Sequence, residues 1–226
     1  MSLPPLPARL FEDRRFVVLN KPAGLPVHPG PRGGASVEDW FPLLSRRADG
    51  PWLAHRLDAD TAGCLVVALR KAALIAAQGC FADGRAGKRY WAVVSGAPAA
   101  SSGEIDAPLL KHSDRSGWRM RVDPSGQAAR TRWQILGRAP GRAWLELELL
   151  SGRTHQARAH CAHLGLPILG DPVYGDGVGQ AEGGGLHLLA RSIALPLDPP
   201  VSAVAPPPPH MRDALERCGW SASAGP

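Results

Sequence analysis

Residues 55–69 read HRLDADTAGCLVVAL, a charged segment that runs directly into an apolar one. Within the apolar half, Leu65 to Leu69 has the length and the β-branched content of a buried strand. The charged half ends in turn-forming residues, so we expect the side chains of residues 55–58 to lie at the edge of that strand. An ordinary polar loop with an internal Arg–Asp pair is the alternative to a functional site here.

The rest of the chain mixes strands and helices without a regular βαβ rhythm, which favours an α+β domain. Further strands are predicted at residues 16–19, 89–95, 131–136 and 143–150. Helices are predicted from the Ser36 cap through Leu44, over 71–81, after a Thr154 cap up to Gly165, and over 210–220. Within 143–150, Leu145, Leu147 and Leu149 share one strand face and Trp144, Glu146 and Glu148 share the other.

Two segments near the C-terminal end have unusual composition. Residues 175–185 hold six glycines and are predicted to form a mobile loop. The segment 196–209 holds seven prolines and is predicted to run extended over the surface. The helix that follows, 210–220, carries Met211, Leu215 and Cys218 on one stripe, as expected for a helix that packs on a core.

Composition narrows the class of protein. The chain has 226 residues, 44% of them apolar, enough to bury a core in one domain. Its longest apolar run is far shorter than the roughly 20 residues that span a bilayer, so no membrane segment is expected. The N-terminus lacks the apolar core of a secretory signal, and the four cysteines form no C-x-x-C pair. A reduced, cytoplasmic protein is the simplest prediction.

The charge of the chain is positive and unevenly distributed. Net charge is +6, and 22 of the 26 basic residues are arginine, the better planar phosphate binder. Residues 111–160 hold ten Lys or Arg against four Asp or Glu, a surplus equal to that of the whole chain. A localised basic surface favours a polyanionic partner, nucleic acid first, although an arginine-rich genome would also enrich arginine.

Two more segments carry residues suited to chemistry. The segment 151–160 reads SGRTHQARAH and includes Arg153 and Arg158, which would lie about 140° apart on a helix and so face different ways. A solvated basic helix end is the alternative. The segment 87–94 reads GKRYWAVV and includes Tyr90, whose alternative role is a packed strand aromatic.

Other active-site templates are missing from the sequence. There is no G-x-S-x-G elbow, no phosphate-binding P-loop and no dinucleotide fingerprint. His160 and His163 are three residues apart, but no H-E-x-x-H or C-x-x-C motif supports them. We therefore predict no metal site.

Four ordered motifs resemble those of the RluA-type RNA pseudouridine synthases. Residues 55–63 resemble the family's H-R-L-D-x-x-T-S-G signature, and 17–25 (VVLNKPAGL) its N-K-P-x-G strand and turn. Residues 88–96 resemble its K-x-Y-x-A-x-V-x-G segment. The segment 152–175 resembles G-R-T-H-Q-[IL]-R followed by G-x-P-I-x-G-D-x-x-Y, and 186–188 its late L-H-A. The resemblance covers about residues 14–200, and Ala62, Ala157 and Leu188 depart from the usual residues.

This resemblance implies a fold and a reaction. The fold would be a pseudouridine-synthase-like α+β domain spanning residues 1–226, with a central mixed, mostly antiparallel sheet, flanking helices and a catalytic cleft. The reaction would convert uridine to pseudouridine within ribosomal or transfer RNA, without cofactor or metal. We expect no N-terminal S4 RNA-binding domain, because only about 15 residues precede the N-K-P strand.

The resemblance also implies roles for individual residues. Asp58 would attack the sugar or assist its deprotonation, because a carboxylate is ionised at neutral pH. Arg158 would hold Asp58 ionised, and Tyr90 would stack on the uracil and assist proton transfer.

Four further residues are predicted to contact the substrate or to support the site. Arg56 would fill the space left by the flipped base. His55 would be a hydrogen-bonding support, Leu186 an apolar wall of the uracil pocket, and Arg153 would face away from Arg158.

Two other functions stay open from the sequence. A non-catalytic RNA-binding or RNA-chaperone protein would need the basic surface but no buried acid. A hydrolytic N-glycosylase would also place a carboxylate near C1′, and it would release free uracil. The expected partner in each case is nucleic acid, and a monomer is the default because no apolar helix stripe is left unpaired.

Overall fold

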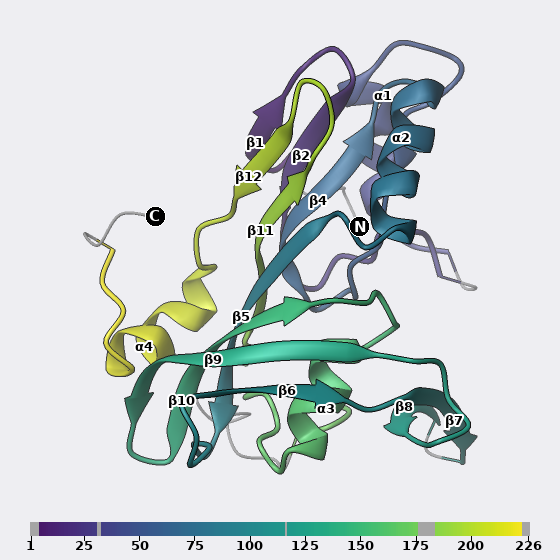
Figure 1. The fold of residues 1–226 in the computed structure, drawn as a ribbon. Helices are drawn as coiled ribbons and strands as arrows, with labels where there is room; N and C mark the ends of the chain where they lie inside the picture. Colours follow the sequence, from purple (N-terminus) through teal and green to yellow (C-terminus); the bar gives the residue numbers. More distant parts are fainter. Residues whose placement is uncertain (1–4, 31–32, 116, 176–183, 223–226) are drawn as a thin grey trace. The chain divides into compact units, whose positions relative to one another are not determined.

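The apolar run that begins at Cys64 forms most of strand β4 (Ala62–Ala68), and every residue of β4 is buried in the computed structural model (Figure 1). The structure describes residues 5–30, 33–115, 117–175 and 184–222. The chain divides into two units: residues 1–88 with 189–206, and residues 89–188 with 207–226. Each unit contributes its own strands and its own buried side chains.

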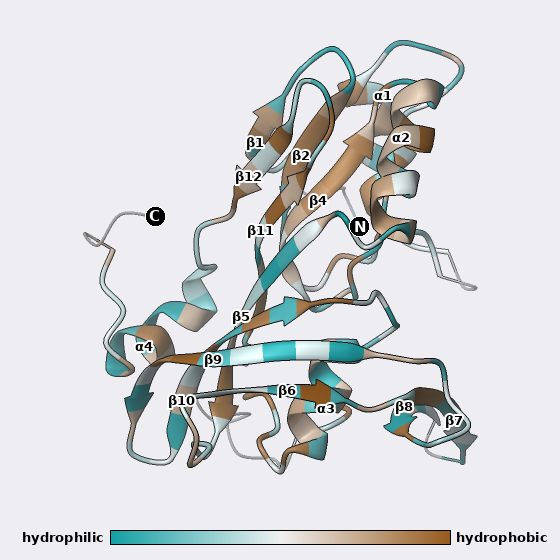
Figure 2. Cartoon of the chain, in the orientation of Figure 1, coloured by the Kyte–Doolittle hydropathy of each residue, from teal (hydrophilic) through white to brown (hydrophobic). Residues whose placement is uncertain are grey.

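The sheet of the first unit is arranged around β4. Its strands are β1 (Arg9–Glu12), β2 (Phe16–Lys21), β3 (Trp52–Leu53), β4, β11 (Leu188–Leu195) and β12 (Val201–Val204). The order is β1-β2-β4-β11, with β3 also on β4 and β12 also on β11. Among the described pairs of this unit, β4 with β11 is parallel and the others are antiparallel. Brown along β2 and β4 marks their apolar sequence in Figure 2.

The parallel pairing explains the glycine at the start of β4. Gly63 has a φ of +112°, and a Cβ there would lie 2.3 Å from the carbonyl oxygen of Ala190 on β11. Any side chain would force the two strands apart. The helices of this unit are the short 3-10 helix η1 (Val37–Trp40), α1 (Phe41–Leu44) and α2 (Lys71–Ala82), of which α2 packs on β3 and β4.

The second unit has an antiparallel sheet in the order β5-β10-β9-β6. Its strands are β5 (Gly87–Ser95), β6 (Ser102–Asp106), β9 (Arg130–Ala139) and β10 (Arg142–Leu149). A separate two-stranded hairpin consists of β7 (Leu109–Asp114) and β8 (Gly117–Val122). Helices α3 (Gln156–His163) and α4 (Pro209–Arg217) complete the unit.

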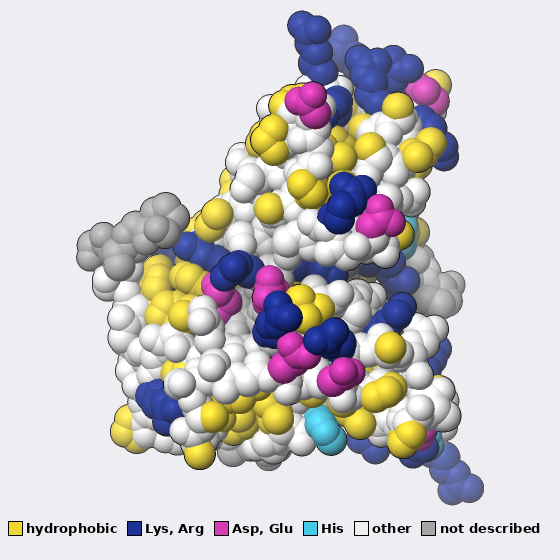
Figure 3. Space-filling view, in the orientation of Figure 1, with side chains coloured by type: hydrophobic (Ala, Val, Ile, Leu, Met, Phe, Trp, Pro, Cys, Tyr) yellow, Lys and Arg dark blue, Asp and Glu magenta, His cyan; other side chains and the backbone are white. Residues whose placement is uncertain are grey.

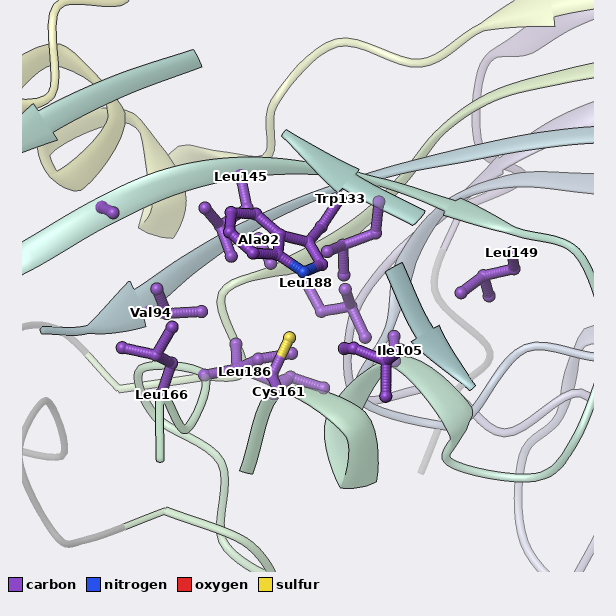
Figure 4. Packing of buried hydrophobic residues seen from close by; sticks show 14 of the residues in the cluster. Ala92, Val94, Ile105, Trp133, Leu145, Leu149, Cys161, Leu166, Leu186 and Leu188 are labelled. Atoms are coloured by element: carbon purple, nitrogen blue, oxygen red, sulfur yellow. The ribbon is translucent and has the colours of Figure 1, made fainter. Parts of the chain in front are cut away.

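One face of this second sheet is apolar and the other is charged. Leu145 and Leu147 of β10 pack with Trp133 of β9 and Cys161 of α3 in one cluster of buried residues (Figure 4). The opposite face carries ion pairs between neighbouring strands: Arg130 and Arg132 with Glu104, and Arg89 with Glu146. Basic and acidic side chains are interleaved there (Figure 3). The predicted alternation along 143–150 is confirmed.

Several predicted elements are confirmed and one cap is wrong. Helix α2, strands β5 and β9, and the α4 stripe with Met211, Leu215 and Cys218 buried all match the prediction. Helix α3 ends before Gly165, which has a φ of +73°. Thr154 is not its cap: the N-cap is His155, which adopts a left-handed φ of 52°. The loop that carries Arg153 thus extends one residue further than predicted before helix α3 begins at Gln156.

The α+β class and the mostly antiparallel strand pairing are confirmed. The proline-rich segment runs extended and contributes β12. Most of the glycine-rich segment 175–185 lies outside the described residues. No helix in the described part of the chain combines the length and the apolar character that crossing a bilayer requires. The extent of a single domain over 1–226 stays a prediction.

Candidate active site

Asp58 lies in a turn that leads into β4, within the first unit. The amide of Thr61 donates to the carbonyl of Asp58 at 3.2 Å and closes this turn. Leu57 and Thr61 are buried on either side, whereas Asp58 is half-buried and Arg56 is exposed. The turn is thus anchored by its buried neighbours Leu57 and Thr61.

The buried side chain of Lys21 is hydrogen-bonded to this turn. Lys21 has no exposed surface, and its ammonium donates to the carbonyls of Pro22, Leu25 and Ala59, each at 2.8 Å. Three carbonyls match the three protons of an ammonium group. The lysine therefore ties the N-K-P-x-G turn to the residue that follows Asp58.

The pKa of Lys21 is affected in opposite directions by burial and by nearby carboxylates. Burial lowers the pKa of Lys21 to about 7, while the negative charges of Asp60 and Asp58 act to raise it. A positive charge thus lies within electrostatic reach of Asp58. No role was predicted for Lys21 from the sequence, and the available signal was a lysine at the end of an apolar strand.

His55 supports the same turn through a hydrogen bond to β4. Its Nε2 accepts the amide proton of Val66 at 3.0 Å, and its ring contacts the Phe81 ring at a centroid distance of 5.0 Å. Burial lowers the pKa of His55 to about 4. A nitrogen that accepts an amide proton must be unprotonated, so His55 is a neutral hydrogen-bond acceptor here.

The second unit contains a buried ion pair on α3. Arg158 donates from Nε and from one terminal nitrogen to the two oxygens of Asp171, at 2.8 and 2.7 Å. The side chains are 3% and 0% exposed. Asp171 also accepts the amide protons of Val173 and Tyr174. Burial alone would raise the pKa of Asp171, but Arg158 and the two amides outweigh it and lower the pKa.

The loop before α3 is held by Gln156, a glutamine to which the sequence assigned no role. Its side-chain carbonyl accepts from the Ser151 hydroxyl and from the Arg153 amide, and its NH₂ group donates to Arg130 and Thr131 of β9. All these contacts lie within 3.0 Å. Gln156 therefore fixes the path of the G-R-T-H-Q loop against the sheet edge.

The remaining predicted site residues of this unit occupy distinct environments. Tyr90 on β5 is half-buried and packs against the core, and Leu186 is 1% exposed within it. Arg153 is exposed and donates to the Ala128 carbonyl at 3.0 Å. Because α3 begins at Gln156, the helical spacing argument for Arg153 does not apply. The two arginines nevertheless have different partners.

The predicted site residues are thus divided between the two units of the chain. Residues 55–58 belong to the first unit, and Tyr90, Arg153, Arg158 and Leu186 belong to the second. Within the described residues, no three His, Cys, Asp or Glu side chains are grouped as metal ligands would be.

Comparison with known proteins identifies the family. The family model for RNA pseudouridylate synthase matches residues 15–163, which include the Asp58 turn, Tyr90 and the α3 motif. The chain belongs to this family. It is an RNA pseudouridine synthase, an isomerase, and the resemblance seen in the four motifs is confirmed.

Similar members of the pseudouridine synthase family cover most of the chain. An uncharacterized RNA pseudouridine synthase of Zymomonas mobilis is 39% identical over 90% of this chain and 95% of its own length. Ribosomal large subunit pseudouridine synthase D of the same organism is 37% identical over 74% of this chain and 55% of its own length.

Solved structures of human synthases share the fold. The structure of human RNA pseudouridylate synthase domain containing 4 is 30% identical and superimposes with a TM-score of 0.79, covering 93% of this chain and 92% of that one. Human RNA pseudouridylate synthase domain containing 1 gives a TM-score of 0.73 at 29% identity, over 89% and 83% of the two chains.

Proposed function

We propose that this synthase converts specific uridines of ribosomal RNA to pseudouridine, with Asp58 as its catalytic residue. The N1–C1′ bond of the uridine breaks, the uracil turns within the site, and C5 joins C1′. The proton on C5 leaves and N1 takes up a proton from solvent, so atoms and charge balance without an oxidant, a metal or a cofactor. The observation that carries the proposal is the Asp58 turn, which the matched family motif contains and the buried Lys21 clamps in place.

A carboxylate suits the step at C1′. It attacks the sugar carbon or assists loss of a sugar proton, and both roles require the ionised form. An ionised group in a closed RNA complex needs a fixed cation to offset the loss of water. We propose that Arg158 supplies this cation to Asp58, as the family motif implies.

The Asp171 pair supports this assignment of Arg158. Asp171 accepts from Nε and Nη2 of the guanidinium, both on one edge of the group. A guanidinium held rigidly by one carboxylate loses little further freedom when it binds a second. Asp171 would thus act as a positioning residue for Arg158.

The other predicted residues complete the proposal. Tyr90 would stack on the uracil and assist the proton transfer that removes the C5 hydrogen, and Leu186 would form an apolar wall of the base pocket. Arg56, exposed beside Asp58, would fill the gap left by the flipped base. His55 would hold the turn as a neutral acceptor. Arg153 would contact the RNA backbone away from Asp58.

The choice of ribosomal RNA rests on relatives. Those named ribosomal large subunit pseudouridine synthase D and C come from Zymomonas and Vibrio species. Transfer RNA is the other substrate class that the motifs imply. We also propose that the protein is a monomer and that it acts in the cytoplasm. The four cysteines are free and buried, as a reducing compartment allows.

Tritium release tests the chemistry and the substrate together. RNA labelled with [5-³H]uridine is taken from cells that lack the protein and separated into ribosomal and transfer fractions. Forming the C5–C1′ bond liberates the tritium. We expect release from the ribosomal fraction by the wild type and none by Asp58→Ala or Asp58→Asn.

A matched control is Asp60→Asn, which removes a second carboxylate from the same turn and should keep activity within a few-fold. Equal loss in Asp60→Asn would show that the turn has been damaged. Normal release by Asp58→Asn would refute the assignment of Asp58, and release from the transfer fraction alone would refute the choice of ribosomal RNA.

A further inference from the structure

Half of the basic surplus of residues 111–160 lies on one hairpin. On β9, Arg130 and Arg132 are paired with Glu104, and Arg158 is buried against Asp171. The β7–β8 hairpin, residues 109–122, holds four Lys or Arg and one Asp, a net charge of +3. Two of its arginines also lie near carboxylates, Arg119 near Asp114 and Arg121 near Asp123. All four of its basic residues are exposed, so the hairpin can still attract RNA phosphates.

An exposed tryptophan lies on this basic hairpin. Trp118 on β8 is 44% exposed, which is unusual for the largest apolar side chain. The Lys111 ammonium lies 4.9 Å from its ring centroid, and the His155 ring stacks on it at 4.8 Å with an interplanar angle of 24°. The Trp118 ring therefore packs against the His155 ring, and the Lys111 ammonium lies close to it.

The supporting ring is itself fixed in place. Nδ1 of His155 lies 3.1 Å from the Tyr174 hydroxyl, and that hydroxyl accepts the amide proton of Met120 at 2.8 Å. Since Met120 lies two residues from Trp118 on β8, the same tyrosine fixes the hairpin and the ring that supports the tryptophan.

We propose that Trp118, supported by His155, is a stacking site for an unpaired base of the RNA substrate, with Lys111 contacting the adjacent phosphate. The proposal rests on the RNA synthase function and adds a specific contact to it. A base offers a flat π-face to an exposed indole, and such stacking contributes about 5- to 150-fold in affinity per base. The Lys111 side chain is exposed, so its ammonium can leave the indole for a phosphate as the base arrives.

Substitution of Trp118 separates stacking from charge. The probes are a single-stranded ten-residue oligouridylate and an abasic oligoribonucleotide of the same length and charge. We expect Trp118→Ala to weaken oligouridylate binding about 5- to 100-fold and Trp118→Phe to recover part of it. The abasic probe should bind the wild type and Trp118→Ala alike.

The matched control is Leu136→Ala, which removes an apolar side chain 38% exposed on β9 of the same unit. It should leave the binding of both probes unchanged. Oligouridylate binding should also quench tryptophan fluorescence in the wild type and not in Trp118→Phe, which retains the other six tryptophans.

Kinetics connect the site to the reaction. In tritium release, Trp118→Ala should raise KM about as much as it weakens oligouridylate binding, with kcat within about threefold. Equal oligouridylate affinity in wild type and Trp118→Ala, with no quenching, would overturn the stacking site. Failure of the wild type to release tritium would overturn the synthase function alone, because the binding comparison does not depend on turnover.

Discussion

Arg158 and Asp171 form a two-bond ion pair in which both side chains are almost completely buried. They lie 13 positions apart along the chain, at opposite ends of the motif that spans residues 152–175: Arg158 ends G-R-T-H-Q-A-R, and Asp171 lies in G-D-P-V-Y. The two ends of this motif therefore meet in one ion pair. This pairing explains why the arginine keeps a fixed orientation on α3.

Replacing Asp171 with asparagine should destabilise the fold by about 3–5 kcal/mol, because it leaves a buried guanidinium without its charge partner. The new amide side chain would keep an oxygen for the amides of Val173 and Tyr174, so the loss reports mainly on the charge. Urea denaturation at pH 7 measures it. The control Asp49→Asn removes an exposed partner of Arg47 and should leave the urea midpoint almost unchanged, because solvent screens that pair.

The same pair predicts the response to acid. The pKa of Asp171 is lowered in the folded chain, so its contribution to stability is present above the unfolded pKa of about 3.9 and is lost as the pH falls through the lower folded value. The stability difference between wild type and Asp171→Asn should shrink below about pH 4. A difference that stays constant to pH 2 would contradict this linkage.

Lys21 should make the free energy of unfolding depend on pH in the neutral to alkaline range. Its folded pKa is lowered from 10.5 to about 7, so between these values the unfolded chain holds a proton that the folded chain has released. Stability therefore rises with pH in this window. The wild type should show this slope from about pH 7 to pH 10, and Lys21→Met should not.

Lys71→Met supplies the control, because Lys71 is exposed at the start of α2. Its stability should follow the wild-type slope. The stabilities of Lys21→Met and the wild type could instead depend on pH in the same way. In that case the three carbonyl contacts keep the ammonium protonated throughout, and the lowered pKa is refuted.

His155 is expected to show a backbone effect that its side-chain contacts do not explain. Its φ of 52° is strained for a residue with a Cβ and unstrained for glycine. His155→Gly should therefore be more stable than His155→Ala by about 1 kcal/mol, although both lose the same ring. Thermal unfolding of the two variants measures the difference, and equal stabilities would show that the left-handed turn relaxes.

Local patterns predicted much of the fold. The alternation of leucines along 143–150, the alanine-rich helix at 71–81 and the stripe on α4 each reflect a single element packing on a core, so the sequence of that element is sufficient. The Asp58 turn was found in the same way, as charge directly before an apolar strand.

Features that depend on distant partners were missed. Lys21 is buried because a carbonyl 38 residues away accepts its proton, and no local pattern distinguishes it from a solvated lysine. The β7–β8 hairpin is polar and basic, with little alternation, and it is held by His155 and Tyr174 from outside. The residue type of Thr154 favours it as a helix cap, whereas the loop geometry set by Gln156 places the turn at His155.

Tyr90 offers a way to separate stacking from proton transfer. Its ring packs against the core of the second unit, and its hydroxyl is the group proposed to assist the proton transfer from C5. Tyr90→Phe should keep KM within about threefold and lower kcat by about 10²- to 10⁴-fold, the usual contribution of a positioned acid or base. Tyr90→Leu should raise KM as well, because the stacking face is lost. Single-turnover tritium release with saturating enzyme measures the chemical step directly, and a Tyr90→Phe variant with nearly normal kcat would assign Tyr90 to stacking alone.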